Sequence, residues 1–165
     1  MKYFLTILIN FFVSCAFSQE TVPSASVILE EAQEKATAEN KKVFIMFHAS
    51  WCGWCHQMDD RMNDEAVKDF FQRNFVVEHL TVLESEKNKH LENPGAKAIM
   101  DKYKGGNSGI PFWLIFDHKG NLLADSLDEN DQNIGCPATE GEVKEFLSIL
   151  KRTTDMNTKE LKTVE

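Results

Sequence analysis

The residues best suited to chemistry by type and spacing are two cysteines, Cys52 and Cys55, which lie three positions apart. This spacing lets the two sulfur atoms reach each other across one helical turn. The pair follows an apolar run, residues 43–47, and precedes a segment with helical character. A cysteine at a helix N-terminus faces unpaired N–H groups and the positive end of the helix dipole, which stabilise its thiolate. The arrangement indicates thiol–disulfide exchange and leaves its direction and substrate open.

Paired cysteines also occur in structural disulfides and in zinc sites. Zinc is usually held by four ligands, and although His48 and His56 are nearby, the sequence has no second cysteine pair. We therefore predict redox chemistry and no metal site. Metal handling by Cys52, Cys55 and His56 remains an alternative, which metal analysis of the purified protein would test.

Length and composition describe a single globular domain. The chain has 165 residues, of which 42% are apolar, enough for a substantial core. Its formal net charge of −8 argues against nonspecific nucleic-acid binding and favours neutral or basic partners. We expect no nucleic acid among its partners.

The N-terminal segment is typical of a signal peptide. Lys2 provides a positive start, residues 3–17 are mostly apolar, and residues 16–18 form a small-x-small cleavage pattern. The apolar run is too short for a comfortable transmembrane span. We predict a signal peptide over residues 1–18 and export to the periplasm or the extracellular space. The alternative is a lipoprotein signal, in which Cys15 is retained and anchors the protein through a lipid.

Export places the chain where disulfides form and persist. The mature chain would keep three cysteines, so one pair and a spare thiol are expected. The spare, Cys136, precedes a proline in a polar loop and is predicted to be a lone thiol.

Apolar patterns and capping signals predict alternating helices and strands. A lead-in over residues 19–25 precedes the domain, residues 26–152, and a flexible tail follows over residues 153–165. Ser26 is the expected cap of the first helix, and a Thr-x-x-Glu capping box at Thr139 starts the last. The expected elements are helix 26–40, strand 43–48, helix 55–73 with a break near Asn63, strand 75–83, a solvated loop or helical turn 84–91, helix 94–103, strands 112–116 and 122–126, and a final helix from Thr139.

This order predicts an α/β fold built on a mixed sheet. Strands separated by helices are expected to pair in parallel through right-handed crossovers, whereas the hairpin of strands 112–116 and 122–126 is antiparallel. The continuous apolar run at residues 43–48 suits a central strand that is covered on both faces. We therefore predict a mixed four-stranded sheet flanked by helices on both faces.

Three features resemble the thioredoxin-fold family. Residues 47–55, Phe-His-Ala-Ser-Trp-Cys-Gly-Trp-Cys, resemble the strand-to-helix active-site segment of thioredoxins. Residues 109–111, Gly-Ile-Pro, stand directly before a predicted strand and resemble the family's cis-proline loop. The hairpin and the capped C-terminal helix resemble the family's closing elements. The resemblance spans residues 26–152, is nearest to exported bacterial thioredoxin-like proteins, and implies a thioredoxin-like fold.

The resemblance also implies roles for individual residues. Cys52 matches the nucleophile that attacks a substrate disulfide, and Cys55 matches the resolving thiol. The positions that match substrate contacts are Trp51, Trp54, Ile110 and Pro111. A cis bond before Pro111 would expose backbone groups that pair with a substrate strand. For Trp54 the alternative is an exposed residue without a role.

Three departures from the family pattern bear on mechanism. Met46 stands where typical thioredoxins hold a buried acid that accepts the proton of the resolving cysteine. Candidates for that proton transfer are water, His56, Glu78 and His79. The inner dipeptide of the motif is Gly-Trp rather than Gly-Pro, and Asp60 stands near the place of the family's helix proline, so reductase behaviour does not carry over directly.

We predict an exported thiol–disulfide oxidoreductase that acts on protein disulfides, with a preference for the reductive direction because Gly53 and Ile110 resemble thioredoxin. It is expected to need no cofactor and to act as a monomer. Its partners would be protein thiols and disulfides and a membrane or soluble recycling partner. The alternative is a noncatalytic peptide-binding or chaperone module, which the missing acid at Met46 keeps open.

Overall fold

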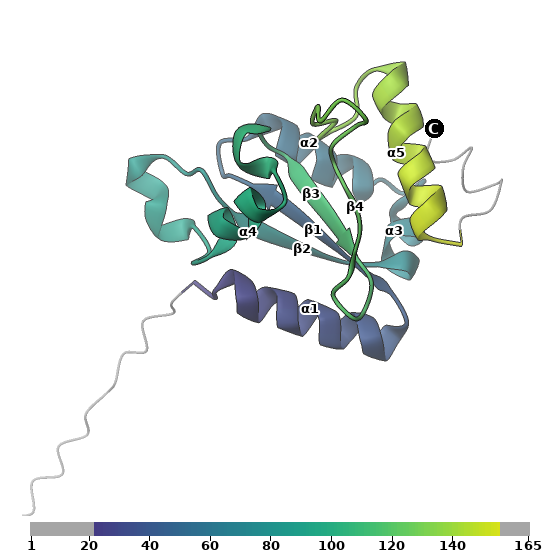
Figure 1. Ribbon diagram of the computed structural model, residues 1–165, viewed down its shortest axis with the longest axis horizontal. Helices are drawn as coiled ribbons and strands as arrows, with labels where there is room; N and C mark the ends of the chain where they lie inside the picture. Colours follow the sequence, from purple (N-terminus) through teal and green to yellow (C-terminus); the bar gives the residue numbers. More distant parts are fainter. Residues whose placement is uncertain (1–21, 156–165) are drawn as a thin grey trace, which may run out of the picture.

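A mixed sheet of four strands forms the centre of the computed structural model, which describes residues 22–155. The strands lie in the order β2-β1-β3-β4 (Figure 1). Their bounds are β1 Lys42–His48, β2 Phe75–Thr81, β3 Phe112–Phe116 and β4 Leu122–Asp125. The sheet and the helices on its two faces confirm the predicted fold class.

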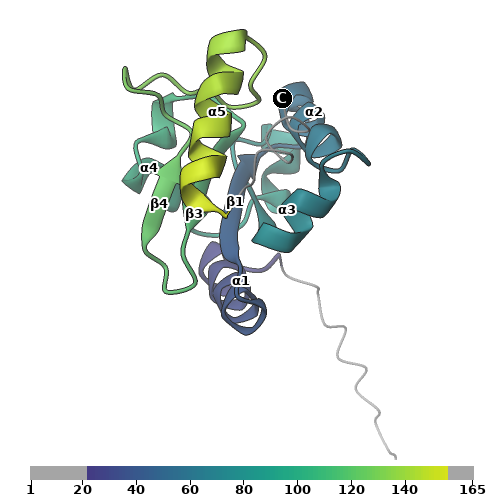
Figure 2. The ribbon, with the colours of Figure 1, turned by 90° about the vertical axis from the view of Figure 1, so that its right-hand side faces the viewer.

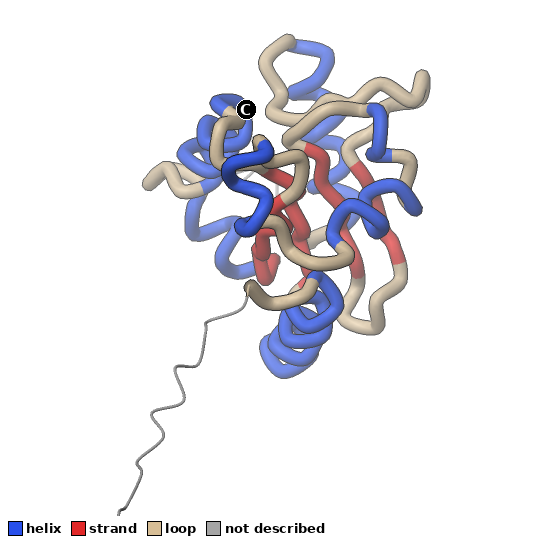
Figure 3. Tube along the Cα trace, turned by 90° about the vertical axis from the view of Figure 1, so that its left-hand side faces the viewer, coloured by secondary structure: helices blue, strands red, loops and turns tan. Residues whose placement is uncertain are grey.

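Helices cover the sheet on both sides. Their bounds are α1 Ala25–Glu39, α2 Gly53–Met62, α3 Lys68–Asn74, α4 Ala96–Lys102 and α5 Glu140–Thr153, with short 3-10 helices η1 Glu86–Leu91 and η2 Gly105–Asn107. One core cluster joins the sheet to α2, α3 and α5, and a second joins it to α1 and α4. Figure 2 shows the sheet between α4 and the α2–α3 pair, and Figure 3 shows the strands, in red, enclosed by helical segments.

Strand β1 is central, and its side chains alternate between the two cores. Phe44 and Met46 belong to the core beneath α2, α3 and α5, whereas Val43, Ile45 and Phe47 belong to the core beneath α1 and α4. All five side chains are fully buried. Because both faces of β1 are covered, the strand is apolar throughout instead of alternating with polar residues.

The direction of β3 corrects one prediction. Strand β2 pairs with β1 in parallel, as expected, but β3 pairs with β1 in antiparallel orientation, with Phe112 beside Phe47. A parallel crossover would need a helix that carries the chain back along the whole strand. Helix α4 has 7 residues and is about 10 Å long, whereas the 7-residue β1 is about 23 Å long. Strand β3 therefore starts at the end of the sheet where β1 finishes.

The break predicted near Asn63 is present, whereas the helix boundaries differ from the prediction by one or two residues. The break expected within helix 55–73 is a turn over residues 63–67 that separates α2 from α3, where the Asp64 carboxylate accepts a backbone N–H two residues later. The cap of α1 is Ser24 rather than Ser26, because the Ser24 hydroxyl oxygen accepts a backbone N–H of the first turn. The helix thus starts one residue earlier than predicted.

The described residues include the predicted last helix but not the predicted signal peptide. Helix α5 begins with the predicted capping box at Thr139 and ends at Thr153, one residue into the predicted tail. The predicted signal peptide, Cys15 and the rest of the tail lie outside the described residues. Within residues 22–155, no helix is long and apolar enough to cross a membrane.

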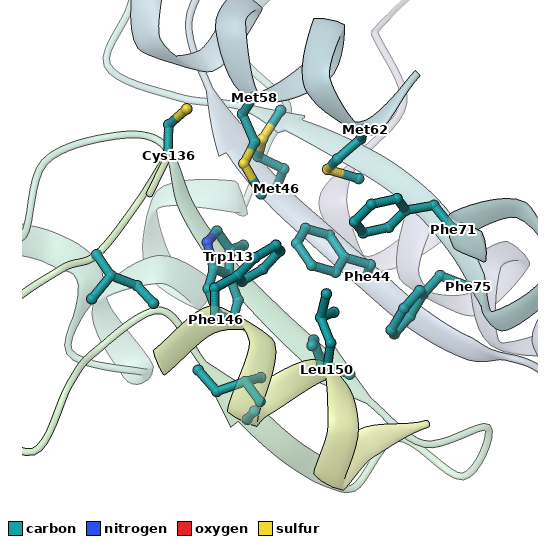
Figure 4. Close-up of a cluster of buried hydrophobic side chains, with 14 of the residues drawn as sticks. Phe44, Met46, Met58, Met62, Phe71, Phe75, Trp113, Cys136, Phe146 and Leu150 are labelled. Carbon is teal, nitrogen blue, oxygen red and sulfur yellow. The ribbon is translucent and has the colours of Figure 1, made fainter. Parts of the chain in front are cut away.

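Trp113 on β3 joins the sheet to the loop that follows β4. Its indole is fully buried, stacks on Phe44 with ring centroids 5.5 Å apart, and meets Phe146 of α5 edge-on at 5.4 Å (Figure 4). Its Nε1–H donates to the carbonyl oxygen of Gly135 at 2.9 Å. The indole thus holds the segment that carries Cys136 against the core.

We expect Trp113→Phe to lower the free energy of unfolding by about 1–3 kcal/mol, because the phenyl ring fills less space and leaves the Gly135 carbonyl oxygen without its donor. Urea unfolding measures this loss. Trp54→Phe is the matched control: Trp54 is exposed, so the same exchange should change stability by less than about 0.5 kcal/mol. Equal losses in the two variants would contradict the role assigned to Trp113.

Candidate active site

Cys52 and Cys55 form a disulfide at the N-terminal end of α2, with an S–S distance of 2.08 Å and Cα atoms 5.3 Å apart. Cys52 is the N-cap residue, and its sulfur accepts the backbone N–H of Cys55 at 3.2 Å. Cys55 is fully buried and Cys52 nearly so. On reduction, a Cys52 thiolate would lie at the positive end of the helix dipole with a backbone donor directed at it.

The loop before β3 lies against this disulfide. The Ile110–Pro111 peptide bond is cis, and the Ile110 carbonyl oxygen lies 3.6 Å from Cys52 Sγ. Ile110 also packs against the two cysteines. The side-chain amide of Asn133 steadies the loop by donating to the carbonyl oxygen of Pro111 at 3.0 Å. Segments 58 residues apart in sequence therefore form one surface.

Trp51 and Trp54 are exposed next to the buried disulfide, with 60% and 55% of their surfaces accessible. The Trp51 Nε1–H donates to the carbonyl oxygen of Leu83 at 2.9 Å, so this indole is held in place although it is exposed. Trp54 lines a surface pocket of about 270 Å³ together with Ile110 and Pro111. The two indoles thus offer exposed apolar area beside the disulfide, whereas Ile110 is half-buried and Pro111 is buried in the adjoining loop.

Glu84 is a site residue that the sequence did not reveal. It is buried, in contrast to the solvated segment predicted for residues 84–91. Its carboxylate accepts the backbone N–H of Ser50 and also the Ser50 hydroxyl, the latter at 2.8 Å. The Ser50 N–H holds the pKa of Glu84 below its usual range. We call this contact between Glu84 and Ser50 the Glu84 clamp; it fixes the residues directly before Cys52. Because the two partners are 34 residues apart, no local sequence pattern predicts the contact.

The candidates for proton transfer are distributed over both faces of the sheet. Met46 is fully buried in the core beneath α2, so the strand position of the family's acid is apolar here. Glu78 pairs with a β1 residue of the α1–α4 core and lies on the opposite face. His56 Nε2 lies 3.0 Å from the carbonyl oxygen of Ser50. His79 pairs with Met46 across the two strands and lies on the α2 face.

Cys136 is a free thiol, as predicted, and it is buried. Burial raises the pKa of its thiol, although Arg61 Nη1 lies 3.6 Å from the sulfur. The thiol form dominates at neutral pH, so Cys136 is a weak nucleophile. Among residues 22–155, no group of three or more His, Cys, Asp or Glu side chains is arranged to hold a metal ion.

The cysteine pair and the cis-proline loop both lie within a segment that matches a known family. The family described as thioredoxin-like matches residues 25–118. This chain belongs to the thioredoxin-like family. The matched residues run from the start of α1 to the turn after β3.

Two solved structures are similar to this chain. The disulphide isomerase from Xylella fastidiosa Temecula1 is 16% identical, and the match covers 79% of this chain and 92% of that chain with a TM-score of 0.57. A thioredoxin from Thermus thermophilus is 18% identical, with 80% and 86% covered and a TM-score of 0.48. The first of these matches shows a common fold.

Curated relatives match part of the thioredoxin-like chain. Spermatogenesis-associated protein 20 of Rattus norvegicus is 27% identical over 86 residues, which is 52% of this chain. The Mus musculus protein of the same name is 26% identical over 86 residues. The chain spans about 10% of the length of these relatives, so the likeness concerns one segment of much longer proteins.

The Glu84 clamp predicts a pH dependence of stability. Because the pKa of Glu84 is lowered in the folded protein, its carboxylate stabilises the fold above the ordinary pKa of 4.5, and this contribution disappears as the pH falls through the folded value. We expect the difference in unfolding free energy between the protein and Glu84→Gln to be constant above about pH 6 and to shrink below about pH 4.5.

Urea unfolding at a series of pH values measures this difference. Glu86→Gln is the matched control, because Glu86 is exposed and lies two residues further along the chain, at the start of η1. A pH trend of equal size in both variants would contradict the clamp.

Proposed function

We propose that this thioredoxin-like protein is an exported thiol–disulfide oxidoreductase that acts on protein disulfides, chiefly in the reductive direction. The observation that carries the proposal is the position of the Cys52–Cys55 disulfide, at the N-terminus of α2 and against Ile110. A helix N-terminus stabilises the thiolate that exchange requires, and the adjacent loop offers backbone groups to an extended substrate segment.

The proposed reduction starts from the dithiol form of the cysteine pair. The Cys52 thiolate attacks one sulfur of the substrate disulfide, and the other substrate sulfur leaves as a thiolate. Cys55 then attacks Cys52 in the mixed disulfide, which forms the Cys52–Cys55 bond and releases the first substrate sulfur. The substrate gains two electrons and the cysteine pair loses two. Oxidation of a substrate is the same sequence in reverse.

The surroundings of the two sulfurs support Cys52 as the attacking residue. Cys52 keeps 4% of its surface accessible and Cys55 keeps none, 0%. The Cys55 N–H donates to the Cys52 sulfur and would stabilise negative charge there. Cys55 faces inward, so we expect it to attack only Cys52 Sγ, after Cys52 has formed the mixed disulfide.

The substrate is proposed to contact Trp51, Trp54, Ile110 and Pro111. The two exposed indoles supply apolar contact area that tolerates different sequences. A substrate strand alongside Ile110 would bring its disulfide to Cys52, because the Ile110 carbonyl oxygen is 3.6 Å from Cys52 Sγ. These contacts suit an extended segment of a protein client.

The proposed protein acts outside the cytoplasm and receives its electrons from a redox partner. The predicted signal peptide over residues 1–18 supports export, with a lipid anchor at Cys15 as the alternative. A membrane or soluble redox partner would recycle the cysteine pair, and the direction of exchange follows from that partner. The protein is proposed to work as a monomer without a cofactor, since the two cysteines themselves hold the electrons.

A noncatalytic peptide-binding or chaperone module is the second candidate. Met46, which replaces the family's buried acid, favours it because catalysis of the resolving step then lacks its usual proton acceptor. The exposed tryptophans would serve peptide binding equally well.

Reduction of insulin disulfides with dithiothreitol as electron donor tests catalysis. We expect Cys52→Ser to lower the catalysed rate at least about 100-fold, because the nucleophile is lost. Cys55→Ser should attack without resolving and should accumulate mixed disulfides with insulin, visible on non-reducing gels.

The matched control is the double variant Cys52→Ser/Cys55→Ser, which should trap nothing. An unchanged rate in Cys52→Ser would overturn the oxidoreductase proposal. Peptide binding that survives in the double variant, without catalysis in the native protein, would favour the binding module.

A further inference from the structure

A buried thiol cannot resolve a mixed disulfide until its proton has left. Cys55 is fully buried, and the neighbouring strand position, Met46, offers a thioether in place of a carboxylate. Polar groups near the first two turns of α2 are therefore candidates to accept this proton. The inference below rests on the thiol–disulfide exchange proposed above and concerns where that proton goes.

Asp59 is the carboxylate on α2 that follows Cys55 by four residues. Residues four apart on a helix lie on the same side, with Cβ atoms about 5–6 Å apart. The Asp59 side chain turns towards β2, where its Oδ1 lies 2.8 Å from His79 Nε2. The carboxylate thus lies one turn along the helix from Cys55, on the side that faces the sheet.

His79, the partner of Asp59, lies on β2 beside Met46 of β1. His79 pairs with Met46 in the register of β2 and β1, so its side chain lies beside the strand position of the family's buried acid. In this chain the carboxylate that contacts the residue beside this strand position therefore comes from α2 instead of from β1.

Asp59 and His79 also have access to water. Their side chains are 31% and 34% exposed, and both line a cavity of about 470 Å³ between α2, α3 and β2. A group that accepts a proton on every turnover must also release it, and an opening of this kind provides the exit.

Charged groups near the pair come from several neighbouring elements. His48 on β1 interacts electrostatically with both residues, and Lys35 on α1, Lys41 before β1 and Lys68 on α3 line the same cavity. Lys41 and Lys68 are paired with Glu39 and Glu65. Burial and the nearby His79 lower the pKa of His48, so His48 is neutral at neutral pH.

We propose that Asp59 is the proton acceptor for Cys55, with His79 as the residue that positions its carboxylate. The proton of the Cys55 thiol moves to a carboxylate oxygen of Asp59, and the Cys55 thiolate attacks the Cys52 sulfur of the mixed disulfide. The Cys52–Cys55 bond forms, and the bond from Cys52 to the substrate sulfur breaks with its electron pair on the departing thiolate. Asp59 then releases the proton to water in the cavity.

The test is a single-turnover reaction of the reduced, full-length protein with oxidised glutathione. The first step, attack by Cys52, depends on glutathione concentration, whereas resolution by Cys55 does not. Acid quenching and mass spectrometry follow the protein–glutathione adduct through this second step. Because the probe is a small disulfide, the readout does not depend on the protein acting on protein substrates.

We expect Asp59→Asn to slow resolution at least about 10-fold at about pH 7, because the amide still accepts the His79 hydrogen bond but takes no proton. The variant's rate should rise about 10-fold per pH unit and approach that of the native protein at alkaline pH, because a growing fraction of Cys55 is then thiolate without help from Asp59. Asp60→Asn is the matched control: it removes the same charge from the adjacent position, which lines a different cavity between α2 and α5. It should keep the native rate and profile.

Asp59→Glu and His79→Gln probe the same step without removing the carboxylate. Both should keep the shallow pH profile of the native protein, since a carboxylate remains on α2 and glutamine can donate to it. A native profile in Asp59→Asn, or a steep profile in Asp59→Glu, would overturn the proposal. If the native protein does not reduce insulin while Asp59→Asn still shows the steep pH profile, the results would support Asp59 as proton acceptor and contradict the proposed action on protein disulfides.

Discussion

Burial of β1 on both faces is the constraint on which the rest of this structure depends. The two cores lie on opposite faces of this strand. Its pairing with β2 on one side and β3 on the other determines at which end of the sheet the loops of β2 and β3 lie. Strand β1 ends at His48, close before the start of α2 at Gly53. The loop after β2 and the loop before β3 lie at that same end, because β2 runs parallel to β1 and β3 antiparallel. The candidate site is the meeting point of these three segments.

Each of the three segments contributes different chemical groups to the site. The start of α2 supplies the two sulfurs, a backbone donor and the positive end of a helix dipole. The loop after β2 supplies Glu84, which holds the residue before Trp51 by two hydrogen bonds. The loop before β3 supplies Ile110, whose carbonyl oxygen lies beside Cys52. The two sulfurs on a short helix are thus held by contacts from both sides.

The antiparallel direction of β3 matters for the chemistry as well as for the topology. Had α4 returned the chain along the whole sheet, the Ile110–Pro111 loop would lie at the far end from Cys52. The proposed proton path also depends on tertiary contacts. Met46 places a thioether at the strand position of the family's acid, and Asp59 on α2 contacts His79, the neighbour of Met46 on β2.

The sequence by itself determined the cysteine pair, the apolar strand before it, the Ile-Pro segment and the capped last helix, because apolar periodicity, capping and motif spacing are local properties. It also indicated the family, since those signals occur in a characteristic order. Tertiary structure decided the direction of β3, the burial of Glu84 against Ser50 and the pairing of Asp59 with His79. These depend on contacts between residues 34 and 20 positions apart, and on the length of a helix relative to a strand, which no local pattern encodes.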